Sequence, residues 1–189
     1  SLSADGQTVA IGAIRNDGSA NQSGHVRVYS WTGSAWSQLG ADIDGEASPD
    51  FPMEYSGHSV SLSADGQTVA IGAPRADGNG INSGHVRIYS WDGSAWSQLG
   101  ADIDGEAQYD ESGWSVSLSA DGQTVAIGAI WNNANGTLNS YWGNVRVFEL
   151  APEATPVSAF TDTISVTVEP VNITPVNDIP TLGALAGIT

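Results

Sequence analysis

The sequence predicts an all-β protein in which three similar units of four antiparallel strands follow one another along the chain. The first observation is a repeat, because the thirteen residues SLSADGQTVAIGA stand at 1–13, 61–73 and 117–129. In each copy, alternating polar and apolar residues flank Ala-Asp-Gly, as in two half-buried strands joined by a short turn. The copies are spaced by about 60 residues, which leaves room for four strands in each unit. This period favours a propeller-like blade or another stacked β unit.

The second copy is complete and shows the order of its elements. Its predicted strands form a meander that covers, in order, residues 56–63, 68–73, 85–91 and 95–99. Gly, Asn and Asp fill a loop at 74–84, and such residues favour turns over strands. An acidic link at 100–113 is expected to lead into the next copy.

The repeat region covers residues 1–150, with blades expected at about 1–47, 55–107 and 112–150. The first copy starts inside its own first strand, and the segment WxGSAWSQLG does not recur after Leu150. Closed propellers typically have about 4–8 blades. We therefore expect an incomplete propeller that leaves sheet margins exposed.

A composition change marks the segment 151–189, which carries five prolines between positions 152 and 180. We read it as a Pro-rich linker with one extended β-strand at 163–169 and a junction to a following repeat. In that strand Ile164, Val166 and Val168 alternate with polar residues. We expect these side chains to form an interface in which the strand adds to an open sheet edge of the third blade or of a neighbouring chain.

The charge is strongly acidic, with 21 Asp and Glu against five Arg and a formal net charge of −16. Such a chain repels nucleic acid and anionic membrane surfaces, so neither is expected as a partner. No apolar run is long enough to suggest membrane insertion. The charge suits a protein kept soluble in salt, or one whose carboxylates hold cations.

Alternate carboxylates followed by Gly suggest an oxygen-ligand site for calcium at two equivalent places. The candidate ligands are Asp42, Asp44 and Glu46 in the first copy, and Asp102, Asp104 and Glu106 in the second. The competing interpretation is an edge strand that buries Ile43 and Ile103 and leaves solvated acids. A weaker candidate is the long loop with Asp17 or Asp77, whereas the single Asp of each Ala-Asp-Gly turn is expected to serve the turn alone.

The tryptophans that flank the WxGSAW segment are expected to pair across a hairpin, with a sugar-stacking platform as the alternative. Four aromatic residues break the repeat pattern in the third copy and are therefore candidates for an interface: Trp114, Trp131, Tyr141 and Trp142. The equivalent residues Arg27, Arg87 and Arg146 are each expected to pair with an acidic residue.

Catalysis is not expected. His25 and His85 give way to Asn144 in the third copy, and His58 gives way to Trp114. No nucleophile, acid pair or Cys stands apart from the repeat. We therefore expect that the protein is not an enzyme.

The segments Ser56-Gly57-His58-Ser59-Val60 and Val69-Ala70-Ile71-Gly72-Ala73-Pro74 resemble an FG-GAP repeat, in which an aromatic-Gly pair opens the first strand and Gly-Ala-Pro closes the second. The resemblance implies a β-propeller similar to the integrin α-subunit head. Ser56 and Ser112 stand where Phe is usual. FG-GAP repeats commonly hold calcium in an Asp-x-Asp-x-Asp-Gly loop between these strands, of which this chain keeps only Ala-Asp-Gly.

The segment 175–180, PVNDIP, resembles the junction that links cadherin-like and VCBS-type repeats in bacterial adhesins. This resemblance implies a large extracellular or cell-surface parent protein of bacterial origin. We expect a structural or adhesive module that assembles with copies of itself or further repeats. The alternative is a calcium-dependent propeller that binds carbohydrate or another ligand, with glycans as partners.

Overall fold

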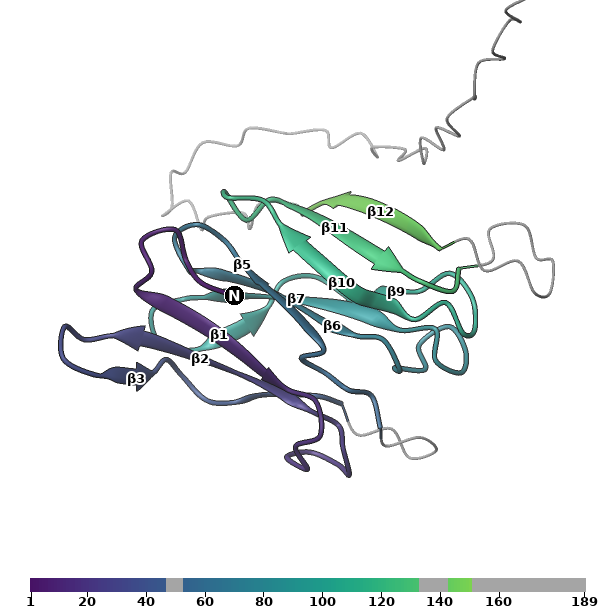
Figure 1. Ribbon diagram of the computed structural model, residues 1–189, viewed down its shortest axis with the longest axis horizontal. Coiled ribbons are helices and arrows are strands. Elements are labelled where there is room, and N and C mark those ends of the chain that lie inside the picture. Colours follow the sequence, from purple (N-terminus) through teal and green to yellow (C-terminus); the bar gives the residue numbers. More distant parts are fainter. Residues whose placement is uncertain (47–52, 133–142, 151–189) are drawn as a thin grey trace, which may run out of the picture. The chain divides into compact units, whose positions relative to one another are not determined.

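The regular elements of the protein are all β-strands in the computed structural model, which describes residues 1–46, 53–132 and 143–150 (Figure 1). These strands form antiparallel sheets that follow one another along the chain, one for each copy of the repeat. The all-β, blade-like prediction is therefore confirmed. In the described residues, no helix reaches the length and hydropathy needed to cross a bilayer. The strand predicted at 163–169 lies outside the described residues.

The second sheet follows the predicted meander. Its strands are β5 (Ser59–Leu62), β6 (Thr68–Ala73), β7 (His85–Trp91), β8 (Trp96–Gln98) and β9 (Ile103–Asp104). The order is β5-β6-β7-β8, and β9 pairs with β7 beyond the end of β8. The segment 100–113 was predicted to be a link between copies, and this prediction is wrong at Ile103–Asp104, which form the strand β9. Because β8 pairs only with Tyr89–Trp91, it leaves the start of β7 free, and β9 pairs there through Val86↔Ile103.

The outer sheets repeat this plan in part. The first consists of β1 (Thr8–Ala13), β2 (His25–Trp31), β3 (Trp36–Gln38) and β4 (Ile43–Asp44). The third consists of β10 (Ser112–Leu118), β11 (Thr124–Ala129) and β12 (Asn144–Glu149). In the first copy, Leu2 makes an isolated antiparallel bridge to Val9.

Two apolar clusters lie at the boundaries between sheets and use equivalent residues. At the first boundary, Val26 and Val28 of β2 pack with Leu62, Val69 and Ile71 of the second sheet. At the second boundary, Val86 and Ile88 of β7 pack in the same way with Leu118, Val125 and Ile127 of the third sheet. Because period-2 alternation gives every strand two faces, the second blade buries one face against the first blade and the other against the third.

Glycines let the backbones of adjacent blades approach closely. A Cβ on Gly12 would strike the carbonyl of Gly57, and a Cβ on Gly72 would strike the carbonyl of Gly113. Gly57 and Gly113 also have φ values of 85° and 86°, which other residues rarely adopt. The Gly positions of the repeat therefore serve contacts between blades.

Candidate metal centre

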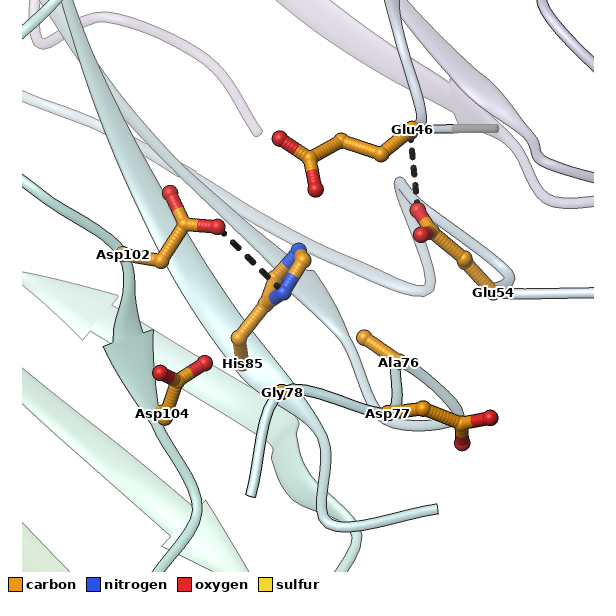
Figure 2. A pocket seen from close by; sticks show the side chains of 8 residues that line it. All are labelled: Glu46, Glu54, Ala76, Asp77, Gly78, His85, Asp102 and Asp104. Atoms are coloured by element: carbon orange, nitrogen blue, oxygen red, sulfur yellow. Dashed lines mark hydrogen bonds and ion pairs between the residues drawn. The ribbon is translucent and has the colours of Figure 1, made fainter. Parts of the chain in front are cut away.

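Strand pairing places His85 beside two carboxylates. Because β7 pairs with β9 through His85↔Asp104, these two side chains share one face of the sheet. Asp102 lies two residues before Asp104, so the strand alternation turns it to the same face. One ligand atom from each of the three residues lies within 4.8 Å of the others. Figure 2 shows both carboxylates on the same side of His85, and Nδ1 of His85 lies 3.6 Å from Oδ2 of Asp102.

The cluster is buried and contains polar atoms that the protein does not satisfy. The His85 side chain is 3% exposed and that of Asp102 is 25% exposed. Nε2 of His85 and Oδ1 of Asp104 are inaccessible to water and have no hydrogen-bond partner. Such atoms are costly in a folded protein and call for a specific explanation.

The cluster opens into a pocket of about 330 Å³ at the boundary between the first and second blades (Figure 2). Glu46 and Glu54, which precede the second repeat, line the pocket opposite His85. The loop at Ala76–Gly78 lines it as well, and a Cβ on Gly78 would strike Oδ1 of Asp104. The missing side chain at Gly78 therefore leaves room for the Asp104 carboxylate.

Burial shifts the protonation of this pocket. It lowers the pKa of His85 to about 4, an effect that Arg87 reinforces and Asp102 opposes. Burial also raises the pKa of Asp104, and the negative charge of Asp102 adds to this rise. The pKa of Glu54 rises to about 7, mainly through burial. At neutral pH the His85 ring is therefore uncharged and carries a lone pair on one nitrogen.

The first copy holds the same three residue types, His25, Asp42 and Asp44, within the same spacing. Here, however, Arg27 occupies Asp42 with two hydrogen bonds, from Nε to Oδ1 at 2.8 Å and from Nη2 to Oδ2 at 2.7 Å. The bonds from Arg27 lower the pKa of Asp42 to about 2. The carboxylate of Asp42 is therefore already engaged by Arg27, although the two clusters contain the same residue types.

In the second copy the equivalent arginine points to another blade. Nη2 of Arg87 donates to the main-chain oxygen of Asp44 at 3.1 Å, and Nη1 lies 3.5 Å from Glu46. Arg146 likewise donates to the main-chain oxygen of Asp104 at 2.6 Å. Pairing with an acidic side chain is therefore confirmed for Arg27 and Arg87, whereas Arg146 reaches a carbonyl group of an acidic residue.

The predicted calcium ligands are brought together only in part. Asp42 lies with Asp44, and Asp102 with Asp104, but Glu46 and Glu106 do not belong to the two clusters. Glu46 faces Arg87, and Glu106 accepts hydrogen bonds from Asn132 at 3.0 Å and Asn144 at 3.1 Å. Ile43 is buried at 6% exposure on an edge strand, as the competing interpretation required.

Sequence reasoning missed the two histidines as ligands. A signal was present, because His25 and His85 open the third strand in the two copies that carry Asp-Ile-Asp. The third copy has Asn144 at this position and no Asp-Ile-Asp segment. The histidine and the acidic segment therefore occur together.

The calcium loop that FG-GAP repeats commonly use does not fit this chain. In each Ala-Asp-Gly turn a single carboxylate is engaged locally, as in Asp65, whose Oδ1 accepts from Ser63 Oγ at 2.6 Å and from the Gln67 amide at 3.0 Å. The expected turn role of Asp5, Asp65 and Asp121 is thereby confirmed. In the long loops, Asp17 and Asp77 accept from the amides of Gln22 and Asn82.

The aromatic residues fall into two groups. Trp31 pairs with Trp36 and Trp91 with Trp96 across strands, with ring centroids 5.5 and 5.4 Å apart, which confirms the predicted pairs. Trp114 is 42% exposed and its ring lies 4.5 Å from that of His58, while Trp131 is 43% exposed. Tyr141 and Trp142 lie outside the described residues, as do Ile164, Val166 and Val168.

The stacked antiparallel sheets define a repeat module of the β-propeller type. The family model described as FG-GAP repeat matches residues 43–89 and 101–148, which together make up about half of the chain. The chain therefore belongs to the FG-GAP repeat family. The matches cover most of the second and third copies, including Gly72 and Gly113, which meet at the boundary between the second and third blades.

Solved structures are similar to the chain at low sequence identity. The chain is similar to hydrazine synthase of Kuenenia stuttgartiensis, with 15% identity and a TM-score of 0.46 over 80% of this chain and 44% of that one. It is also similar to the tricorn protease, with 13% identity and a TM-score of 0.45 over 92% of this chain and 17% of that one. This chain thus spans less than half the length of either structure. No curated protein matches it.

Proposed function

We propose that this protein is a structural module that extends a β-propeller-type stack by docking another FG-GAP blade, supplied by a second copy when the chain is isolated. The observation that carries the proposal is a difference between equivalent residues. Ile71 and Ile127 are 1% and 0% exposed because a preceding blade covers them, whereas Ile11 in the first blade is 52% exposed. Leu2 on the same face is 60% exposed, although Leu62 and Leu118 are buried.

The third blade exposes the complementary face. Val145 and Val147 of β12 are 69% and 66% exposed. Their equivalents in the second blade, Val86 and Ile88, are 0% and 1% exposed beneath the third blade. Exposed apolar side chains that share one face commonly mark a contact site.

These two faces are the two halves of the boundary that already occurs twice inside the chain. The face of β12 offers the apolar pair that β2 and β7 offer at their boundaries. The face of the first blade offers Leu2, Val9 and Ile11, which correspond to Leu118, Val125 and Ile127. A second copy can therefore dock head to tail, and such a heterologous contact produces rings or filaments.

Burial of an exposed Val, Leu or Ile contributes about 1.5–3 kcal/mol. Five such side chains give a sum comparable to the about 4–15 kcal/mol that association costs in lost freedom of motion. We therefore expect assembly that depends on protein concentration.

Two variants test this proposal, and each of them introduces a charge into one of the two exposed apolar faces. Ile11→Asp leaves the β12 face intact, and Val147→Asp leaves the face of the first blade intact. Each variant alone should sediment as a monomer at a concentration at which the unmodified chain assembles. Their equimolar mixture should form a dimer and nothing larger, because only one productive contact remains.

The matched control is Ile81→Asp, which places the same charge at an apolar loop residue that is 39% exposed. This variant should assemble like the unmodified chain, and circular dichroism should show all variants folded. An unmodified chain that stays monomeric at every concentration, or a mixture that does not dimerise, contradicts the proposal.

We place this module, as part of the same proposal, in an extracellular bacterial protein with an adhesive rather than enzymatic role. The net charge of −16 and the tandem repeats support it. Binding of the fluorescently labelled chain to bacterial cells and to glycan arrays tests the adhesive role. Equal binding of the unmodified chain and a denatured sample would contradict it.

A second candidate function is cation-dependent ligand binding, which the two His/Asp/Asp clusters favour. This function requires that a chelator lower the melting temperature and that glycans change tryptophan fluorescence in the presence of the cation. A chain indifferent to both would exclude it.

A further inference from the structure

We propose that His85, Asp102 and Asp104 form a binding site for a divalent transition-metal cation of the zinc type, and that Arg27 blocks the equivalent cluster His25, Asp42 and Asp44. The site lies between two blades of the same chain. The inference therefore does not depend on the docking of a second copy.

The donor set favours zinc over calcium. One imidazole nitrogen and two carboxylates are common ligands of Zn²⁺, which leaves a fourth position for water. Calcium instead takes about 6–8 oxygen ligands. The 3.6 Å between Nδ1 of His85 and Oδ2 of Asp102 is close to the about 3.4 Å that separates two ligands of a tetrahedral cation with bonds of about 2.1 Å.

A second observation points to a missing partner. Oδ1 of Asp104 is buried and has no hydrogen-bond partner, and the His85 side chain is 3% exposed. Figure 2 shows one nitrogen of the imidazole facing Asp102, with Asp104 on the same side of His85. A bound cation gives the Asp104 carboxylate the partner that the described part of the chain does not provide.

The surroundings also favour a cation. Glu46, Glu54 and Asp77 line the pocket that contains Asp102 and Asp104, so five acidic residues line it in total. Arg87 lies beside Glu46 and donates its hydrogen bond to the Asp44 main-chain oxygen rather than to a carboxylate of the cluster. A divalent cation reduces the repulsion among these acids, and its binding should stabilise the boundary between the first two blades.

Identical residues in the first copy provide an internal comparison. Arg27 donates to both oxygens of Asp42, and Gln38 Nε2 donates to Oδ1 at 2.7 Å. In the second copy Gln98 takes the equivalent place on Asp102 at 2.6 Å, but Arg87 is turned toward the first blade. Oδ2 of Asp102 therefore stays available, while that of Asp42 is occupied.

Calorimetric titration of the full chain with Zn²⁺ tests the site. The unmodified chain should bind one equivalent tightly, and His85→Ala and Asp104→Asn should each weaken binding by about tenfold or more. His25→Ala and the surface control His58→Ala should leave the tight site unchanged. Arg27→Gln should add a second site, because it frees Asp42.

Thermal unfolding provides a second readout that separates a site from loss of folding. Zn²⁺ should raise the melting temperature of the unmodified chain and of Val147→Asp, which cannot assemble through β12, but not that of Asp104→Asn. The proposal would be overturned if His25→Ala and His85→Ala lost the same amount of zinc affinity. It would also be overturned if Ca²⁺ raised the melting temperature and Zn²⁺ did not. Zinc binding in a chain that never assembles would uphold this inference and reject the docking proposal alone.

Discussion

Arg87 leaves its own blade and donates a hydrogen bond to the main-chain oxygen of Asp44 in the preceding blade, at 3.1 Å. Its side chain is 5% exposed. The equivalent Arg27, in the first blade described, is 43% exposed and turns back to Asp42 of its own blade. The same residue type in the same strand position is therefore a link between blades in one copy and a surface ion pair in the other.

Replacement of Arg87 should therefore cost more stability than replacement of Arg27. Arg87→Ala leaves the Asp44 carbonyl and Glu46 without their partner and should reduce the free energy of unfolding by about 1–3 kcal/mol. Arg27→Ala removes a solvent-exposed pair and should cost less than Arg87→Ala, because solvent screens such pairs. Urea unfolding of both variants measures the difference, and equal losses would contradict the assignment of Arg87 as a link between blades.

Two equivalent glycines should differ in the same way. A Cβ on Gly72 would strike the carbonyl of Gly113 in the next blade, whereas the nearest atoms to a Cβ on Gly128 all belong to Ser115. Gly72→Ala should lower stability by about 2 kcal/mol because the backbones must separate. Gly128→Ala should be nearly neutral, since the Ser115 hydroxyl can rotate away. Equal melting temperatures for the two variants would show that the backbone contact is not tight.

The paired tryptophans offer a third comparison. Nε1 of Trp96 donates to the main-chain oxygen of Leu39 in the preceding blade at 2.8 Å, and its ring packs on the first apolar cluster. Trp36 is 46% exposed. Trp96→Ala should cost about 2 kcal/mol and Trp36→Ala less than about 1 kcal/mol, because both lose a cross-strand pair but only Trp96 loses contacts between blades. Chemical denaturation measures both values, and a larger cost for Trp36 would contradict this reasoning.

The pH dependence of stability should contain a contribution from Glu54. Burial raises its pKa from 4.5 to about 7, so the folded chain holds this proton more tightly than the unfolded chain. The stabilisation is fully present below about pH 4.5 and is lost as the pH rises through about 7.

Glu54→Gln removes this titration. Relative to the unmodified chain, the variant should gain on the order of 1 kcal/mol between pH 4.5 and 7.5, less than the pKa shift alone suggests because the pocket is open to solvent. Unfolding free energies at the two pH values provide the measurement. Parallel pH profiles for the two proteins would show that Glu54 does not titrate in this range.

The hairpins and their registers could be predicted from the sequence because strand alternation is local. In the second copy the pattern from Ser61 to Ala73 predicted the turn and the strand pairing, and the structure agrees with it. The prediction of half-buried strands is wrong for β6, which is buried on both faces because a neighbouring blade covers each of them. The strand β9 could not be predicted, because it is two residues long and its sequence is acidic with a single apolar residue between the acids. It forms because β8 leaves the start of β7 unpaired.

The candidate site was predicted only through its acids. His85 belongs to the site because β9 returns to β7, and that pairing joins residues almost twenty positions apart. The difference between Arg27 and Arg87 has no sequence signal, since the surrounding residues are nearly the same. It arises from whether a blade lies in front of the arginine, which is a property of the stack.

The turns of the three blades are joined in series: the Ala4 amide donates to the Ala64 carbonyl at 2.8 Å, and the Ala64 amide donates to the Ala120 carbonyl at 2.9 Å. Each link uses the same residue on both of its sides. A gene that gains or loses a whole unit by unequal recombination therefore places every surviving turn next to one that it already fits. The length of such an array can change in a single genetic event, without a compensating substitution elsewhere.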